Sequence, residues 1–154
     1  MLRPYQSGAS VEEILAWCEK EVDKFSVYFY ADNLNFFKRS GRVSGMAATM
    51  GNILGIRPII YIGNDGKMTN IGKEKGKQKV VNRLLNYVDE LGENISNYTI
   101  VIGHTDYLDE ALKLGARLEE KYGKLDIDYV CVNHVCGAHC GPDSIGIAFH
   151  SKHR

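Results

Sequence analysis

The sequence predicts an α/β (α+β) fold, a two-layer sandwich in which helices pack on one mixed six-stranded sheet. Short β-branched or alternating apolar segments indicate six strands, at 25–31, 56–62, 67–71, 98–102, 127–132 and 145–149. Residues 77–91 and 108–122 carry apolar side chains at helical spacing, so helices alternate with the strands. No linker, low-complexity tract or internal repeat divides the 154 residues, which suits a single main domain.

The N-terminal elements follow from local signals. Ser10 and Glu13 have the spacing of a capping box, which predicts a helix running to about Asp23. The apolar side of this helix would carry Val11, Ile14, Leu15 and Cys18. Residues 25–31 alternate as a strand, and 34–39 predict a short helix. Small and apolar residues at 46–54 predict a tightly packed, buried helix.

The remaining elements interleave. Strand 56–62 is followed by the turn Asn64-Asp65-Gly66, and strand 67–71 completes a hairpin. Helix 77–91, strand 98–102, helix 108–122 and the last two strands then alternate. The opening helix has no strand before it, and we expect it to connect to something upstream.

Charge and hydropathy exclude several classes of protein. Lys plus Arg and Asp plus Glu both total 19, so the formal net charge is zero and we expect no nucleic-acid partner. No apolar run approaches the ~20 residues that span a bilayer, so we expect no transmembrane segment. The first ten residues lack the apolar core of a signal peptide, which favours a cytoplasmic location with reduced cysteines.

A run of cysteines and histidines near the C-terminus suggests a zinc-dependent hydrolase as the alternative function, through Cys131, His134, Cys136, His139 and Cys140. The candidate ligand pairs Cys131/His134 and Cys136/His139 are separated by a single residue. This spacing is too close for the usual tetrahedral convergence of four ligands. A strand running through His134 would also place Cys131 and His134 on opposite faces. A Cys–His nucleophile pair lacks a third group to orient the histidine. We therefore expect no metal, assign the cysteines to packing and assign His134 no role.

His139 is the stronger candidate within this run. Gly137, Ala138 and Gly141-Pro142 surround it with small or rigid residues, which let the backbone approach a ligand closely. A turn of this kind would hold one imidazole at the rim of a pocket, where it could donate a hydrogen bond to a carboxylate. The alternative is a histidine that merely satisfies a loop carbonyl.

Basic residues form two further candidate sites. Lysines alternate before a helix, at Lys73, Lys75, Lys77 and Lys79, and helix N-termini with nearby lysines bind phosphate. The spacing from Gly72 to Gly76 is one residue too short for a P-loop, so a solvated surface is the preferred interpretation. A regulatory or scaffolding domain that binds nucleic acid or a partner through these lysines is the second rival function. Arg42, in the turn 41–45, either recognises phosphate or carboxylate or is simply exposed.

Several motifs in this order resemble those of the DegV family of bacterial fatty-acid-binding proteins. They are the segments SVEEILAW, ADNLNFFKRSGRVSG, NILGIRPIIYIGNDGKM and GAHCGPDSIGIAF. The resemblance covers nearly the whole chain but only the second half of the family's two-domain architecture. It implies that residues 1–24 form a helix connecting to a missing N-terminal domain and that 25–154 form the C-terminal domain.

The resemblance also implies a function and site residues. A protein of this family holds a long-chain fatty acid and presents its carboxylate to a separate ATP-dependent fatty acid kinase that makes acyl phosphate. In that scheme the chain is a carrier without catalytic residues or cofactor, and His139 reaches toward the carboxylate. Arg42 and Lys75 match positions associated with partner or phosphate contact. Asp143 replaces the last glycine of the family's Gly-Pro-Gly motif.

A long acyl chain needs a narrow apolar tunnel, because each buried CH₂ contributes ~0.8 kcal/mol. Residues near the Gly-Arg-Val-Ser turn are expected to line it or to contact the fatty acid: Arg42, Ser44, Met46, Met50, Ile53 and Leu54. Each apolar member of this set could equally be ordinary core.

Overall fold

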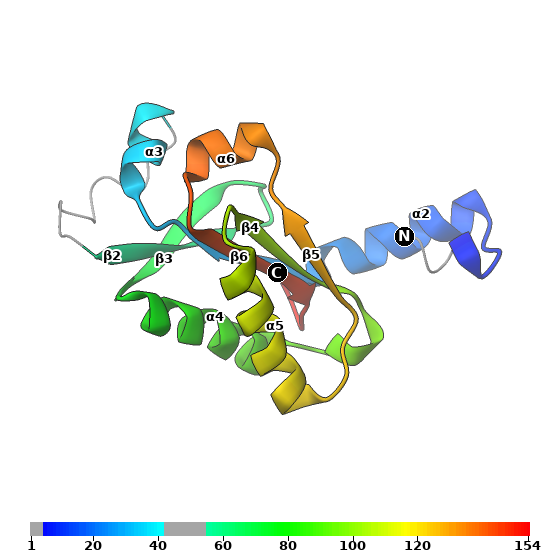
Figure 1. Ribbon diagram of the computed structural model, residues 1–154. Coiled ribbons are helices and arrows are strands. Elements are labelled where there is room, and N and C mark those ends of the chain that lie inside the picture. Colours follow the sequence, from blue (N-terminus) through cyan, green and yellow to red (C-terminus); the bar gives the residue numbers. More distant parts are fainter. Residues whose placement is uncertain (1–4, 42–54) are drawn as a thin grey trace.

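A computed structural model describes residues 5–41 and 55–154, which form a mixed sheet with helices on both of its faces (Figure 1). The strand order is β3-β2-β1-β6-β4-β5, where β4 and β5 pair in parallel and the other neighbours pair antiparallel. The strands are β1 (Phe25–Tyr30), β2 (Ile56–Ile62), β3 (Met68–Lys75), β4 (Ile100–Thr105), β5 (Ile127–Cys131) and β6 (Ser144–His150). The predicted fold class, with six strands in one mixed sheet, is confirmed.

The main core lies between one sheet face and two long amphipathic helices, α4 (Lys77–Leu91) and α5 (Leu108–Tyr122). Strand residues alternate, so every second side chain enters this core. Its fully buried members include Tyr30, Ile59, Leu84, Ile100, Ile102, Leu114, Leu118, Ile145, Ile147 and Phe149. Burying each such apolar side chain contributes about 1.5–3 kcal/mol, so this layer holds the sheet together.

A smaller cluster lies on the opposite sheet face, under the short helices α3 (Leu34–Arg39) and α6 (His134–Cys140). In Figure 1 these two helices lie side by side above one end of the sheet. Phe37 is fully buried there with Ala31 and Ile60, and Phe29 and Cys140 pack against the cluster. This small core brings α6, and therefore His139, close to the chain segment that follows β1.

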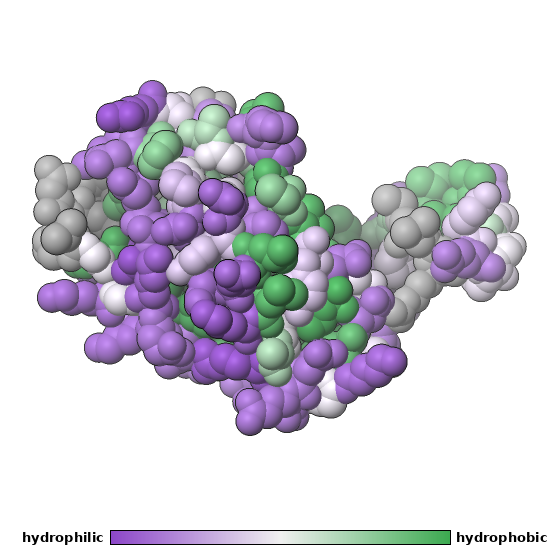
Figure 2. Space-filling model, in the orientation of Figure 1, coloured by the Kyte–Doolittle hydropathy of each residue, from purple (hydrophilic) through white to green (hydrophobic). Residues whose placement is uncertain are grey.

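Helix α2 (Val11–Glu21) begins at the predicted capping box and projects from the body (Figure 1). The Glu13 backbone N–H donates to Ser10 Oγ over 3.2 Å, and Glu13 Oε2 accepts from the Ser10 backbone N–H over 2.7 Å. Val11 and Leu15 are 68% and 59% exposed, whereas Ile14 and Cys18 are partly buried, so the apolar side expected from the sequence is only partly covered. Figure 2 shows apolar surface on this projecting lobe.

Polar contacts with the C-terminal residues hold the base of α2. His150 Nε2 lies 3.2 Å from Glu21 Oε2, and both side chains are buried. Hydrogen bonds from Lys24 and then His150 hold the pKa of the Glu21 carboxyl below its ordinary value. The Ser151 backbone N–H donates to the Lys24 carbonyl over 2.7 Å. The direction of α2 is therefore set by side chains from the other end of the chain.

Several element boundaries differ from the prediction. Strand β3 continues to Lys75 because it pairs with β2 along its whole length, and β4 starts at Ile100, after the 3₁₀ turn η2 (Ile95–Asn97). Helix α2 ends at Glu21, where the 3₁₀ turn η1 (Val22–Lys24) begins. Helix α6 was not predicted. The helix expected at 46–54 lies outside the described residues.

Candidate functional site

Helix α6 carries His139 in its last turn, so the prediction that this residue sits in a turn was wrong. Asn133 caps the helix, because its Oδ1 accepts a hydrogen bond from the Cys136 backbone N–H over 3.0 Å. Gly141 follows the last residue with φ +74°, a left-handed conformation that suits glycine. An N-cap asparagine and a glycine just past the end are helix signals, and these would have located α6 from the sequence.

One ring nitrogen of His139 lacks a partner. Its Nδ1 is buried from solvent and makes no hydrogen bond with any described residue, although the side chain as a whole is only partly buried. A buried polar atom without a partner costs roughly 1–3 kcal/mol, so such atoms normally find one. The expected alternative, a histidine that satisfies a loop carbonyl, does not account for this nitrogen.

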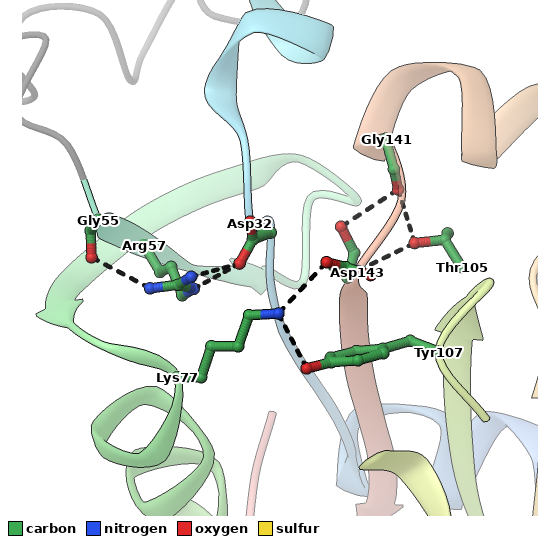
Figure 3. Close-up of polar contacts among 9 residues, drawn as sticks. Asp32, Gly55, Arg57, Lys77, Thr105, Tyr107, Gly141 and Asp143 are labelled. Atoms are coloured by element: carbon green, nitrogen blue, oxygen red, sulfur yellow. Dashed lines mark hydrogen bonds and ion pairs between the residues drawn. The ribbon is translucent and has the colours of Figure 1, made fainter. Parts of the chain in front are cut away.

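Thr105, at the end of β4, holds the turn that follows α6 (Figure 3). Its Oγ1 donates to the Gly141 carbonyl over 2.6 Å and accepts from the Ser144 backbone N–H over 3.0 Å. The Asp143 backbone N–H donates to the Thr105 carbonyl over 2.9 Å. These bonds set the turn in one position relative to the sheet, and with it the end of α6.

Gly141 also makes the contact between α6 and α3. A Cβ built on Gly141 would lie 2.4 Å from Cδ2 of the Phe36 ring, a distance that no side chain tolerates. The absence of a side chain therefore lets the ring pack directly on the backbone next to His139. This close approach explains the glycine at position 141, whereas a Cβ on Gly137 would meet nothing within 4 Å.

The sheet face beside this cluster presents a half-buried apolar strip on the three strands β1, β6 and β4. Cross-strand neighbours on these strands form it: Val27, Phe29, Val101, Gly103, Gly146 and Ala148. Glycine in a strand interior marks a close approach by another group. At Gly146 that group is Phe29, whose Cβ would lie 2.9 Å from an added Cβ. The strip is apolar, narrow and free of charged side chains.

Lys77, the first residue of α4, joins three elements beside the turn that follows α6 (Figure 3). Its Nζ lies 3.0 Å from Tyr107 Oη and 3.2 Å from Asp143 Oδ2. The ammonium also stands over the Tyr107 ring, 4.7 Å from the centroid. The hydrogen bond with Tyr107, followed by that with Asp143, raises the pKa of Lys77. The site therefore holds a cation next to the turn that follows His139.

A second ion pair, between Arg57 and Asp32, was not anticipated from the sequence. Arg57 Nε and Nη2 lie 2.7 Å and 2.5 Å from Asp32 Oδ1, and Nη1 donates to the Gly55 carbonyl over 3.1 Å. Arg57 is only 8% exposed. Arginine inside an apolar strand, two residues past a glycine, carried no recognisable motif. The pair ties the start of β2 to the residues after β1.

The cysteines differ from the prediction. Cys131 and Cys136 are exposed, so assigning them to packing was wrong: β5 ends at Cys131, and Cys136 lies in the first turn of α6. Cys140 does pack against the small cluster, and burial raises the pKa of its thiol to about 11. No group of three or more His, Cys, Asp or Glu side chains in the described ranges could hold a metal ion. Zinc chemistry is therefore not favoured.

The other predicted site residues are divided. Lys75 ends β3 and is exposed, and all four lysines of the run lie on the surface, as preferred from the sequence. His134 is the exposed first residue of α6. The remaining candidates lie outside the described residues: Arg42, Ser44, Met46, Met50, Ile53 and Leu54.

Comparison with known proteins assigns the family. A family model described as "Uncharacterised protein, DegV family COG1307" matches residues 2–152. The chain belongs to the DegV family. Among DegV relatives, a DegV domain-containing protein of Clostridium perfringens is 34% identical over 146 residues, which cover 94% of this chain and 50% of that protein. The chain thus spans about half the length of such relatives.

Solved DegV structures have the same fold. The fatty acid binding DegV family protein of Streptococcus agalactiae is 25% identical with a TM-score of 0.82, over 98% of this chain and 53% of that one. DegV of Bacillus subtilis, described as a fatty acid binding protein, is also 25% identical with a TM-score of 0.77, over 97% and 53%. Within its described residues, this DegV chain has no helix long and apolar enough to cross a membrane.

Proposed function

We propose that this chain is the C-terminal half of a fatty-acid carrier, which holds a long-chain fatty acid and offers its carboxylate at His139. The observation that carries the proposal is the buried, unpartnered Nδ1 of His139. A carboxylate inside an apolar site is costly unless donors meet it, and this nitrogen is one such donor. The half-buried apolar strip on β1, β6 and β4 is a suitable floor for the acyl chain. The names of the related S. agalactiae and B. subtilis proteins support the same ligand class.

An upstream domain and a kinase complete the proposal. The exposed apolar side chains of α2, Val11 and Leu15, are expected to pack on an N-terminal domain that supplies the other carboxylate donors. Residues 25–154 would then form the C-terminal domain. A protein of the same fold from Streptococcus pneumoniae, 18% identical, is named Fatty Acid Kinase B3 and was solved with linoleic acid. We therefore propose a separate ATP-dependent fatty acid kinase as partner, with Arg42 and Lys75 as candidate contacts and the chain itself as a non-catalytic cytoplasmic carrier.

Native mass spectrometry tests the ligand class. The chain is analysed alone and after mixing with the upstream half of a DegV relative, each incubated with oleate. We expect a mass increment of one fatty acid. Bound zinc without lipid would overturn the proposal and restore the hydrolase alternative.

Substitution of the histidine tests the site. His139→Phe removes the donor while keeping a ring, and we expect oleate affinity to fall about ten- to hundredfold, because hydrogen bonds to charged groups contribute roughly 1.5–3 kcal/mol. His134→Gln, on the exposed first position of the same helix, is the matched control and should bind like the wild type. Equal affinity of the His139→Phe variant and the control would refute the role of His139.

A further inference from the structure

The turn after α6 carries a negative charge in an unusual backbone conformation. Asp143 has φ +59°, in the left-handed region that favours glycine and that aspartate tolerates better than most residues. The DegV motif that this segment resembles ends in glycine at this position. The chain therefore accepts some backbone strain at a position where it places a carboxylate.

That carboxylate is paired rather than free. Asp143 Oδ2 lies 3.2 Å from Lys77 Nζ, and the two side chains are 41% and 43% exposed. The same ammonium lies 3.0 Å from Tyr107 Oη, so the lysine is held by two partners from different elements. Its position next to the turn is consequently defined, although water reaches both charges.

The pair lies within electrostatic range of His139. His139 and Asp143 are four positions apart in the sequence, so their Cα atoms lie within about 14 Å of one another. The hydrogen bonds of Thr105 to the Gly141 carbonyl and from the Asp143 backbone N–H draw the turn together. A fatty-acid carboxylate bound at His139 would therefore be attracted by Lys77 and repelled by Asp143.

We propose that Lys77 and Asp143 set the affinity of the site for an anionic head group, with Lys77 attracting the ligand carboxylate and Asp143 acting as an internal counter-ion that weakens this attraction. This inference rests on the proposed function. Charges separated by up to roughly 14 Å in a partly aqueous environment interact weakly, which corresponds to roughly a two- to fivefold change in affinity for each charge removed. In this proposal Lys77 and Asp143 determine specificity for the head group in addition to joining α4 to the turn after α6.

The test compares charged and neutral ligands of equal chain length. Oleate and oleyl alcohol are titrated against the wild type, Asp143→Asn, Lys77→Gln and the double variant, at low ionic strength where screening is weak. We expect Asp143→Asn to bind oleate roughly two- to fivefold more tightly, Lys77→Gln to bind it weaker by a similar factor, and the double variant to return toward the wild type. Affinity for oleyl alcohol should not change.

Two controls separate charge from structure. Asp143→Gly, which suits φ +59°, should reproduce the oleate result of Asp143→Asn. Glu120→Gln removes one carboxylate near the far end of α5, about 18 Å along the helix from its start, and should leave oleate affinity unchanged.

The possible outcomes separate the role of Lys77 and Asp143 from the proposed carrier function. Equal oleate affinity across all variants of a wild type that binds oleate would overturn this inference and leave the carrier function standing. Parallel changes for oleate and oleyl alcohol would also overturn it, since they would indicate altered structure rather than charge. A wild type that binds neither ligand, alone or with the upstream half of a relative, would overturn the proposed function together with the inference.

Discussion

Gly141→Ala is expected to destabilise the protein and to displace α6 from α3. The added methyl group would meet the Phe36 ring at 2.4 Å, and the residue would still have to adopt φ +74°. The left-handed conformation costs an alanine about 1–2 kcal/mol, and forcing an extra methyl into a packed contact costs about 1–3 kcal/mol. A loss of about 2–5 kcal/mol is a large part of the 5–15 kcal/mol that stabilises a typical domain.

Urea denaturation followed by far-UV circular dichroism measures this loss, and a double-mutant cycle divides it. In a Phe36→Ala background the clash disappears while the backbone strain at Gly141 remains, so Gly141→Ala should then cost only about 1–2 kcal/mol. Gly137→Ala, within α6, is the matched control. A Cβ there meets nothing within 4 Å, and the substitution should stabilise the helix by roughly 0.5–1 kcal/mol.

A change in the free energy of unfolding of less than about 0.5 kcal/mol on Gly141→Ala, as ordinary surface substitutions give, would refute the predicted clash and backbone strain at this residue. An equal cost of Gly141→Ala in the wild-type and Phe36→Ala backgrounds would show that the ring does not press on this residue. A negligible effect of Gly141→Ala would mean that α6 is held by something other than the Phe36 contact.

Three further predictions concern other parts of the molecule. Gly115→Ala should lower stability by about 1–3 kcal/mol, because its Cβ would lie 1.9 Å from Tyr129 Oη, and Tyr129→Phe should relieve much of this loss in urea titrations. Ser10→Ala should cost about 1 kcal/mol and reduce the helical signal of α2 in circular dichroism, since it removes the N-cap; an unchanged signal would argue against the cap. Iodoacetamide at pH 8 should label the exposed Cys136 before Cys140, whose pKa burial raises to about 11, and mass-spectrometric mapping showing the reverse order would contradict the described packing of Cys140.

Local periodicity was sufficient to predict most of the fold. Helices α4 and α5 have the predicted bounds because their apolar stripes are long and regular. The capping box of α2 is likewise a local signal, complete within four residues. The end of β3 was placed too early because its last residues are polar and are held in the strand by pairing with β2, which no local pattern records.

Helix α6 shows what local patterns miss. Its seven residues include glycine, cysteine and histidine, which have modest helix propensity, so composition alone does not predict a helix here. The signals for this helix are at its ends, the N-cap Asn133 and the following Gly141. The run of metal-competent side chains suggested convergence, but Cys136 is exposed, Cys140 packs against the small cluster, and no group of three or more potential ligands forms in the described ranges.

The sequence by itself determined the order of the strands and of the longer helices, the mixed sheet, the DegV resemblance and the choice of His139 as the candidate residue. Each depends on periodicity, capping or motif spacing, which are properties of neighbouring residues. Only the tertiary structure decided that His139 Nδ1 is buried without a partner in the described region, that Gly141 touches Phe36, and that Lys77 pairs with Asp143. The two contacts join residues 66 and 105 positions apart, and the third feature depends on burial, because packing of distant segments determines which polar groups keep water and which need a partner.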